Sequence, residues 1–118
     1  GESSTGIFSL AHSNQALIIV GGDCQKETMT TQHHFYSLDD GKKWIAPTAP
    51  TRGYRECVES VTNKTVVATG PSGTDISYDN GISWNALSDE RGLHVIRKAR
   101  KGSLVMLAGS KGQVFQLK

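Results

Sequence analysis

The sequence is poor in cysteine, proline and long apolar runs, and it carries little net charge. Its 118 residues include 2 cysteines and 3 prolines, and the formal net charge is +2. Cys24 and Cys57 do not make a disulfide framework, and whether they pair stays open. The longest apolar run, residues 16–20, is far too short to cross a membrane. Charges this mild and this interspersed do not favour nucleic acid or an anionic membrane as a partner.

Signals for export, modification and metal binding are also scarce. Residues 1–5 lack the character of a signal peptide, and no Cys-x-x-Cys is present. Asn63 starts a glycosylation sequon, which matters only in a eukaryotic secretory route. His33 and His34 are adjacent, and neighbours in an extended segment point to opposite faces, so one metal ion rarely takes both. We expect solvated loop histidines, no metal site and no cofactor.

Turns are abundant, in keeping with 13 glycines, and one octapeptide turn occurs twice. Residues 37–44 and 77–84 both read Ser-x-Asp-x-Gly-x-x-Trp. Asp40-Gly41 and Asn80-Gly81 favour a tight hairpin, because both central residues of such a turn need positive φ. The octapeptide lacks the run of acidic and carbonyl positions of a dedicated calcium loop. We therefore predict two structural turns.

The aspartate in the third position of each octapeptide can accept hydrogen bonds from its own loop, which holds the turn shut. The tryptophan starts the return strand, where it can bury a large ring. We expect Asp39 and Asp79 to hold their turns, and both tryptophans to be largely buried. The structural residues of the two turns are Ser37, Asp39, Gly41, Trp44, Ser77, Asp79, Gly81 and Trp84.

The octapeptides belong to a longer repeat. Ser37 and Ser77 are 40 residues apart, and Arg52 and Arg91 are 39 residues apart. Between these markers, β-branched and aromatic residues fall in short runs separated by turn residues, and no convincing helical period with caps is found. The sequence predicts an all-β chain of about three four-stranded antiparallel meanders. These units span about residues 6–51, 52–90 and, incompletely, 91–118.

A four-stranded unit of about 40 residues in tandem is the signature of a β-propeller blade. A ring closes with about four to eight blades, so residues 1–118 predict a partial β-propeller with an incomplete ring. Either the remaining blades belong to a longer chain, or another copy of this chain completes the ring. The alternative fold is a compact two-sheet β-sandwich built from the same hairpins.

The octapeptide resembles the Asp-box, or BNR repeat, of β-propeller proteins, where it also falls between the third and fourth strands of a unit. Proteins with this box include sialidases, sortilin-type receptors and photosystem II stability/assembly factor-like proteins. The likeness is strongest to the C-terminal blades of bacterial members of the last group, through residues 53–55, 70–77 and 97–102. It covers about residues 6–118. The resemblance implies a non-catalytic scaffold that binds a protein partner or assists the assembly of a complex, and it favours a secreted or periplasmic location.

Successive turns of an up-and-down meander alternate between the two ends of the unit, which separates one set of polar residues from the octapeptide turns. Arg52 and Arg91 lie at equivalent places on the opposite end, and Arg55 and His94 open the innermost strand, which lines the channel of a propeller. We expect exposed charges, solvated or structurally paired, that contribute little to stability, with Asp75 either contacting a ligand or orienting an arginine. Arginine and tyrosine serve binding hot spots. The candidate binding residues are Arg52, Tyr54, Arg55, Asp75, Arg91 and His94.

A sialidase-like or other carbohydrate-binding propeller is the alternative function. Sialidases of this fold clamp a carboxylate with three arginines, whose planar forks match it, and they add a tyrosine–glutamate pair and an aspartate. Tyr54 and Glu56 lie beside the arginines of this chain. Such a site draws on nearly the whole ring, however, and a shared fold is weak warrant for a shared reaction. We therefore expect a binding scaffold with no catalytic residues.

Overall fold

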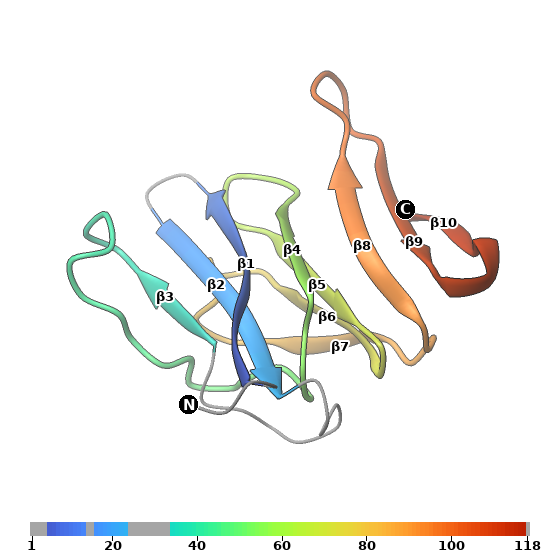
Figure 1. Cartoon of the computed structure of the whole chain (residues 1–118). Coiled ribbons are helices and arrows are strands. Elements are labelled where there is room, and N and C mark those ends of the chain that lie inside the picture. The colour runs from blue at the N-terminus through green and yellow to red at the C-terminus, as the bar shows by residue number, and fades with distance from the viewer. Residues whose placement is uncertain (1–4, 14–15, 24–33, 118) are drawn as a thin grey trace.

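The structure is a computed structural model that describes residues 5–13, 16–23 and 34–117 (Figure 1). Over these residues the chain is all-β, as expected, with ten strands in three antiparallel sheets and one three-residue 3-10 turn at Ser110–Gly112. No helix in this part of the chain is long and apolar enough to span a membrane. The strands are β1 (Thr5–Ser13), β2 (Ala16–Asp23) and β3 (Phe35–Ser37) in the first sheet, β4 (Cys57–Ser60), β5 (Val66–Gly70), β6 (Gly73–Ser77) and β7 (Asn85–Ser88) in the second, and β8 (Leu93–Lys98), β9 (Val105–Gly109) and β10 (Val114–Leu117) in the third.

Each sheet is a meander in which consecutive strands are neighbours, as the repeat predicts. Only the second sheet has four strands, because the expected return strand at Trp44-Ile45 is reduced to one bridge between Tyr36 and Ile45. The first strands of the three sheets lie together, β1 against β4 and β4 against β8. The sheets spread outwards from these strands (Figure 1).

Two separate cores hold the sheets together, and the central strand β5 contributes to both. Val66 and Ala68 pack towards the first sheet, on Ile18 among others, whereas Val67 packs towards the third sheet, on residues such as Ile96. Alternate residues of a strand point to opposite faces, so a strand buried on both sides reads as a continuous apolar run. The sequence Val-Val-Ala-Thr-Gly of β5, buried throughout, has this pattern.

Three glycines mark the same place in each sheet. A Cβ atom on Gly21, Gly70 or Gly109 would lie 1.9, 2.5 or 2.0 Å from the carbonyl oxygen of Gly6, Tyr54 or Gly92, respectively, which no side chain tolerates. The residues that follow these three carbonyls, Ile7, Arg55 and Leu93, are therefore equivalent. The expected equivalence of Arg55 and His94 is wrong by one residue, because the loop between β8 and β9 is one residue longer than the loop between β4 and β5.

The two octapeptide turns have the same geometry, and the aspartate of each accepts a hydrogen bond from its own loop. Asp39 accepts a 2.8 Å hydrogen bond from the N–H of Lys43, and Asp79 accepts one of 2.8 Å from the N–H of Ser83. In each turn the serine hydroxyl donates to the aspartate and accepts the N–H of the glycine at 2.8 Å. The central residues have positive φ, 60° and 85° in the first turn and 61° and 86° in the second.

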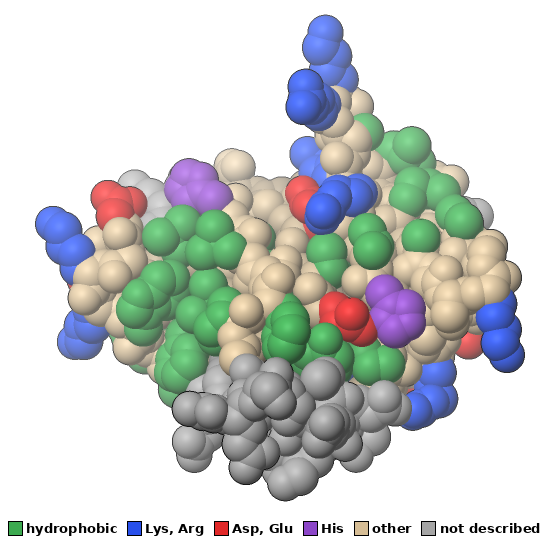
Figure 2. All heavy atoms as spheres, in the orientation of Figure 1, with side chains coloured by type: hydrophobic (Ala, Val, Ile, Leu, Met, Phe, Trp, Pro, Cys, Tyr) green, Lys and Arg blue, Asp and Glu red, His purple; other side chains and the backbone are tan. Residues whose placement is uncertain are grey.

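The two tryptophans differ, although their turns do not. Trp84 is 6% exposed and packs into the core between the first and second sheets, as expected, whereas Trp44 is 39% exposed. The expectation of a buried Trp44 is wrong because its side of the first sheet has no neighbouring sheet in the described chain. Hydrophobic side chains gather there, over β1, β2 and β3, at the left of Figure 2.

This contrast predicts different costs for the same substitution. Trp84→Ala should lower the free energy of unfolding by about 3–5 kcal/mol, since it removes a large buried ring. Trp44→Ala should cost much less, because its ring is half-exposed. Urea unfolding of dilute protein, followed by far-UV circular dichroism, measures both values. Equal losses would contradict the assignment of Trp84, and not Trp44, to the core.

The hydrogen bonds of the second turn predict a pH dependence. Burial by itself raises the pKa of Asp79, but hydrogen bonds from Ser83 and Ser77 outweigh it and leave that pKa below its ordinary value of 3.8. The charged Asp79 carboxylate therefore contributes its full stabilisation of the fold at pH values above the ordinary pKa. This contribution is lost as the pH falls through the pKa of Asp79 in the folded chain. Asp79→Ala should lower the free energy of unfolding by about 1–3 kcal/mol at neutral pH, because it leaves backbone N–H groups of the turn without an acceptor.

The difference between wild type and Asp79→Ala should shrink at about pH 3, where the unfolded chain binds the extra proton. Urea unfolding midpoints of wild type and Asp79→Ala at the two pH values measure this difference, and the exposed Glu90→Ala is the matched control. A destabilisation that is the same at both pH values would mean that the charge of Asp79 does not hold the turn.

Candidate functional site

An arginine–aspartate cluster, made of Arg52, Arg55 and Asp75, lies at the end of the second sheet opposite its octapeptide turn. Asp75 is in β6 and is 1% exposed. Its Oδ1 accepts the Nε–H of Arg52 at 2.6 Å, and its Oδ2 accepts the backbone N–H of Arg52 at 3.0 Å. Oδ2 also accepts Nε–H and Nη2–H of Arg55 at 3.0 and 2.8 Å. One buried carboxylate thus holds two guanidinium groups.

Arg55 is fully buried, and its remaining partners belong to the same region. Its Nη1 donates to the carbonyl oxygen of Tyr54 and to the hydroxyl of Ser72, both at 2.9 Å. Burial lowers the pKa of Arg55, and the charge of Asp75 counteracts this effect. A buried guanidinium is tolerated only when it is paired and its donors are satisfied. Arg55 therefore fixes the start of β4 to the turn between β5 and β6.

Arg52 extends the cluster to the surface, where its side chain is half-exposed. Its Nη2 donates at 2.9 Å to the carbonyl oxygens of Thr74 and Ser88, and its Nη1 pairs with Asp89. Burial acts to lower the pKa of Arg52, but the hydrogen bonds that its guanidinium donates to Asp75 and Asp89 outweigh this effect and raise that pKa. Gly73 leaves room for the guanidinium, since a Cβ there would lie 3.1 Å from Nη2.

A second buried polar group connects the cluster to the first sheet. His34 is 2% exposed, with Nε2 at 3.0 Å from the carbonyl oxygen of Gly21 and Nδ1 at 2.6 Å from the hydroxyl of Thr51. The same Gly21 oxygen accepts the backbone N–H of Arg55 at 2.9 Å. The expectation of a solvated His34 is wrong, because the ring closes the junction between the sheets. His33 lies outside the described residues.

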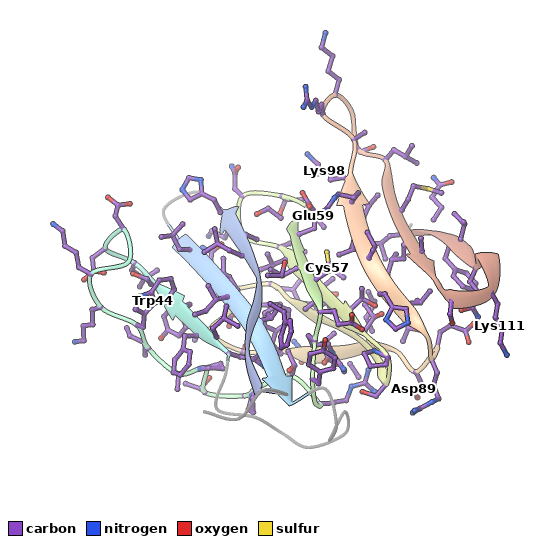
Figure 3. The ribbon with its side chains drawn as sticks, in the orientation of Figure 1. Trp44, Cys57, Glu59, Asp89, Lys98 and Lys111 are labelled. Atoms are coloured by element: carbon purple, nitrogen blue, oxygen red, sulfur yellow. The ribbon has the colours of Figure 1, made fainter. Side chains whose placement is uncertain are left out.

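Exposed charged groups surround the buried arginine–aspartate cluster at this end of the sheets. His94 is half-exposed, and its Nδ1 lies 2.5 Å from the Glu56 carboxylate. Arg91 and Lys111 line a shallow depression of about 350 Å³ together with Pro71, Gly92, Ser110 and Gln113. Figure 3 places Asp89 and Lys111 at this same end. Exposed groups of both signs thus lie next to a buried, hydrogen-bonded network.

The structure brings three of the six candidate binding residues into one cluster and separates the others. The expectation that Arg55 is an exposed charge is wrong: its guanidinium and the carboxylate of Asp75 are buried against one another. Tyr54 is also buried, with its ring 5.2 Å from that of Phe8 in an edge-on contact. Arg91 is exposed and His94 half-exposed, near this end. Neutralising Arg55 must therefore affect stability as well as any binding.

Sequence reasoning missed the surface partners of the cluster, Asp89 for Arg52 and Glu56 for His94. A signal for Glu56 was its place beside Arg55 in the repeat, but Asp89 sits in a link whose path a pattern does not give. Cys57, the one described cysteine, is free and buried, with Sγ at 3.4 Å from the carbonyl oxygen of Ile96. Cys24 lies outside the described residues. The exposed Asn63 of the sequon lies near the second octapeptide turn.

The cluster predicts a large asymmetry between two aspartates that contact Arg52. Asp75→Ala should lower the free energy of unfolding by about 3–5 kcal/mol, because it leaves the buried Arg55 charge unpaired. Asp89→Ala should cost less than about 1 kcal/mol, since that side chain is 90% exposed. Chemical unfolding of the two variants beside wild type measures both. A small loss from Asp75→Ala would mean that water reaches Arg55.

Within the described ranges, no group of three or more His, Cys, Asp or Glu side chains is placed to hold a metal ion. The cluster's own chemistry is ionic and structural, because its donors and acceptors satisfy each other. Comparison of the chain with protein-family models, with curated proteins and with solved structures gave no match.

Proposed function

We propose that the chain is a non-catalytic, Asp-box-type β-propeller module that binds a protein partner. The binding surface is the end of the sheets that carries Arg52, Arg91 and His94. Several features support the propeller assignment: three consecutive meanders, adjacent first strands, and the repeated octapeptide turn between the last two strands of the second sheet. By this assignment the module resembles photosystem II stability/assembly factor-like proteins, and its role is the assembly of a larger complex in a secreted or periplasmic setting.

The observation that carries the binding role is the way Arg52 is held. Three sides of its guanidinium are fixed by Asp75, by Asp89 and by two backbone carbonyl oxygens, yet the side chain stays half-exposed. An arginine that is already ordered loses little conformational entropy on binding. Arginines of this kind are frequent among residues that dominate protein interfaces. The Arg55–Asp75 pair beneath it supplies the rigid base.

The surrounding charges favour a partner protein with a mixed polar surface. Arg91 and Lys111 supply positive charge beside the depression, while Asp89 and Glu56 supply negative charge nearby. Charges of both signs at the rim of an interface fix its register and select the partner more than they add affinity. A uniformly anionic partner such as nucleic acid fits this pattern poorly.

A sialidase-like clamp would need guanidinium groups whose forks are free for a substrate carboxylate. The forks of Arg52 and Arg55 already bind Asp75, and their other N–H groups meet peptide carbonyls, Asp89 and Ser72. These contacts count against the carbohydrate alternative at this cluster and favour the binding module.

The test compares two double variants at opposite ends of the sheets. Arg91→Ala with Lys111→Ala should reduce capture of a partner from an extract of the source cells about tenfold, since both charges border the proposed surface. Lys42→Ala with Lys43→Ala, in the first octapeptide turn, should leave capture unchanged. Quantitative mass spectrometry of the captured proteins measures both, and unfolding midpoints should stay near that of wild type.

Equal loss from the two double variants would show that the wrong end has been chosen. Turnover of a fluorogenic sialoside by the wild-type chain would overturn the non-catalytic assignment in favour of the carbohydrate-active alternative.

A further inference from the structure

One face of the first sheet is apolar and is covered by none of the residues that the structure describes, and we call it the outer face. Directly paired residues share a face of a sheet, and the pairs Leu10–Ile19 and Ile19–Phe35 point away from the core that contains Ile18. Trp44 lies on the same side, because a Cβ on Gly41 would touch both its ring and Leu17. The residues of the outer face are Ile7, Leu10, Leu17, Ile19, Phe35 and Trp44, and Figure 2 shows this hydrophobic area at the left.

The equivalent face is covered in both of the other sheets. The equivalence follows from Gly21, Gly70 and Gly109, which we call the close-approach glycines. Leu10 corresponds to Val58 and Ile96, because the partner of each precedes the close-approach glycine of its sheet by two residues. These partners are Ile19, Ala68 and Leu107. Leu10 is 58% exposed, whereas Val58 and Ile96 are 2% and 0% exposed. The tryptophans of the octapeptide turns show the same contrast. The outer face thus has the composition of a buried face.

The chain itself shows what covers such a face. The N–H of Val58 donates to the hydroxyl of Ser9 at 3.0 Å, and the N–H of Ile96 donates to Sγ of Cys57 at 3.5 Å. Ser9 and Cys57 are equivalent, because their partners Val20 and Thr69 each immediately precede the close-approach glycine. We call the face of a sheet that points to the following sheet its far face, and the opposite face its near face. In both cases the far face of one sheet meets the near face of the next at the same position.

The third sheet has a residue equivalent to Ser9 and Cys57, and no other part of the described chain covers it. Ala108 precedes Gly109, and its partner in β8 is Val95, which is 42% exposed. Val114 also pairs with Ala108 and is exposed. We call this surface the far face of the third sheet, with Val95, Met106, Ala108 and Val114 as its apolar residues. It corresponds to the far faces of the first and second sheets, which are buried.

We propose that the outer face of the first sheet binds the far face of the third sheet in a second copy of the chain, with Leu10 of one copy against Val95 of the other. The contact is head-to-tail, because the two surfaces differ, and such contacts form rings when the rotation closes. Two copies of three sheets give six, within the range of about four to eight that closes a propeller. The expected assembly is therefore a dimer with two identical contacts.

Sedimentation equilibrium of the chain over a range of concentrations should give twice the mass of one chain. Leu10→Asp and Val95→Asp, each at an exposed position, should keep the wild-type circular dichroism spectrum and sediment as single chains. Tyr78→Asp, at an exposed residue of the second octapeptide turn, is the matched control and should remain a dimer.

Mixing the two variants makes the test specific for a head-to-tail contact. Leu10→Asp keeps an intact far face and Val95→Asp keeps an intact outer face, so the equimolar mixture should recover dimers through one contact. If two outer faces bound each other instead, Val95→Asp alone would dimerise. That result, or a wild-type chain that sediments as a single copy at every concentration, overturns the proposal.

Cross-linking checks the residue pair itself. In a Cys24→Ser background, copies with Leu10→Cys and copies with Val95→Cys should form a disulfide-linked dimer on mild oxidation, and the pair Tyr78→Cys with Val95→Cys should not. Capture of a different protein at the outer face, with no cross-link between copies, contradicts self-association. This inference depends on sheet packing and not on the proposed binding surface, because Arg91→Ala with Lys111→Ala should leave the dimer intact.

Discussion

Burial of the second sheet on both faces is the constraint on which the rest of the structure depends. Strand β5 contributes Val66 and Ala68 to one core and Val67 to the other, so the same strand separates the two cores and belongs to both. A sheet with two apolar faces is stable only between two neighbours. The first and third sheets supply those neighbours, and each of them is left with one face that no described residue covers.

The arginine–aspartate cluster occupies a position that the other sheets fill with apolar side chains. Arg55 corresponds to Ile7 and Leu93, and Asp75 corresponds to Phe35 and Phe115, by the glycine positions and the strand registers. A buried ion pair seldom adds stability over an apolar pair, because both charges must be desolvated. Here the pair also positions neighbouring segments. The carboxylate binds Arg52 in the link at residues 51–53, and Arg52 in turn binds the end of β7. The buried pair thus fixes the position of Arg52 at the surface of the central sheet.

Much of the fold follows from the sequence, and the errors have physical causes. The two octapeptides determine their turns locally, through positive φ and hydrogen bonds within eight residues, so a pattern is enough to find them. Trp44 and Trp84 occupy the same position of the same octapeptide pattern, and their burial differs because another sheet packs over Trp84 and none of the described residues does so over Trp44, which no local pattern contains. Arg55 and His34 were expected in solvent because charged and polar residues usually are. Their burial depends on partners 13 to 20 residues away, Gly21 for His34 and Asp75 for Arg55. The sequence therefore indicated which residues gather at this end of the sheets, but it did not foresee that Arg55, Asp75 and His34 are buried there.

Because the first and third sheets contribute to separate cores, the stability of the chain is approximately a sum of sheet and interface contributions, as in repeat proteins. Both cores depend on the second sheet. Removing the third sheet would uncover Val67 and Ile76 but leave the first core whole, whereas disordering β5 would disrupt both cores. Local opening should therefore begin at the ends, in β3 or β10, and we expect the slowest amide hydrogen exchange in β5. The same linear arrangement lets the chain loosen at its terminal sheets without unfolding, since neither end sheet contributes a residue to the core at the other end.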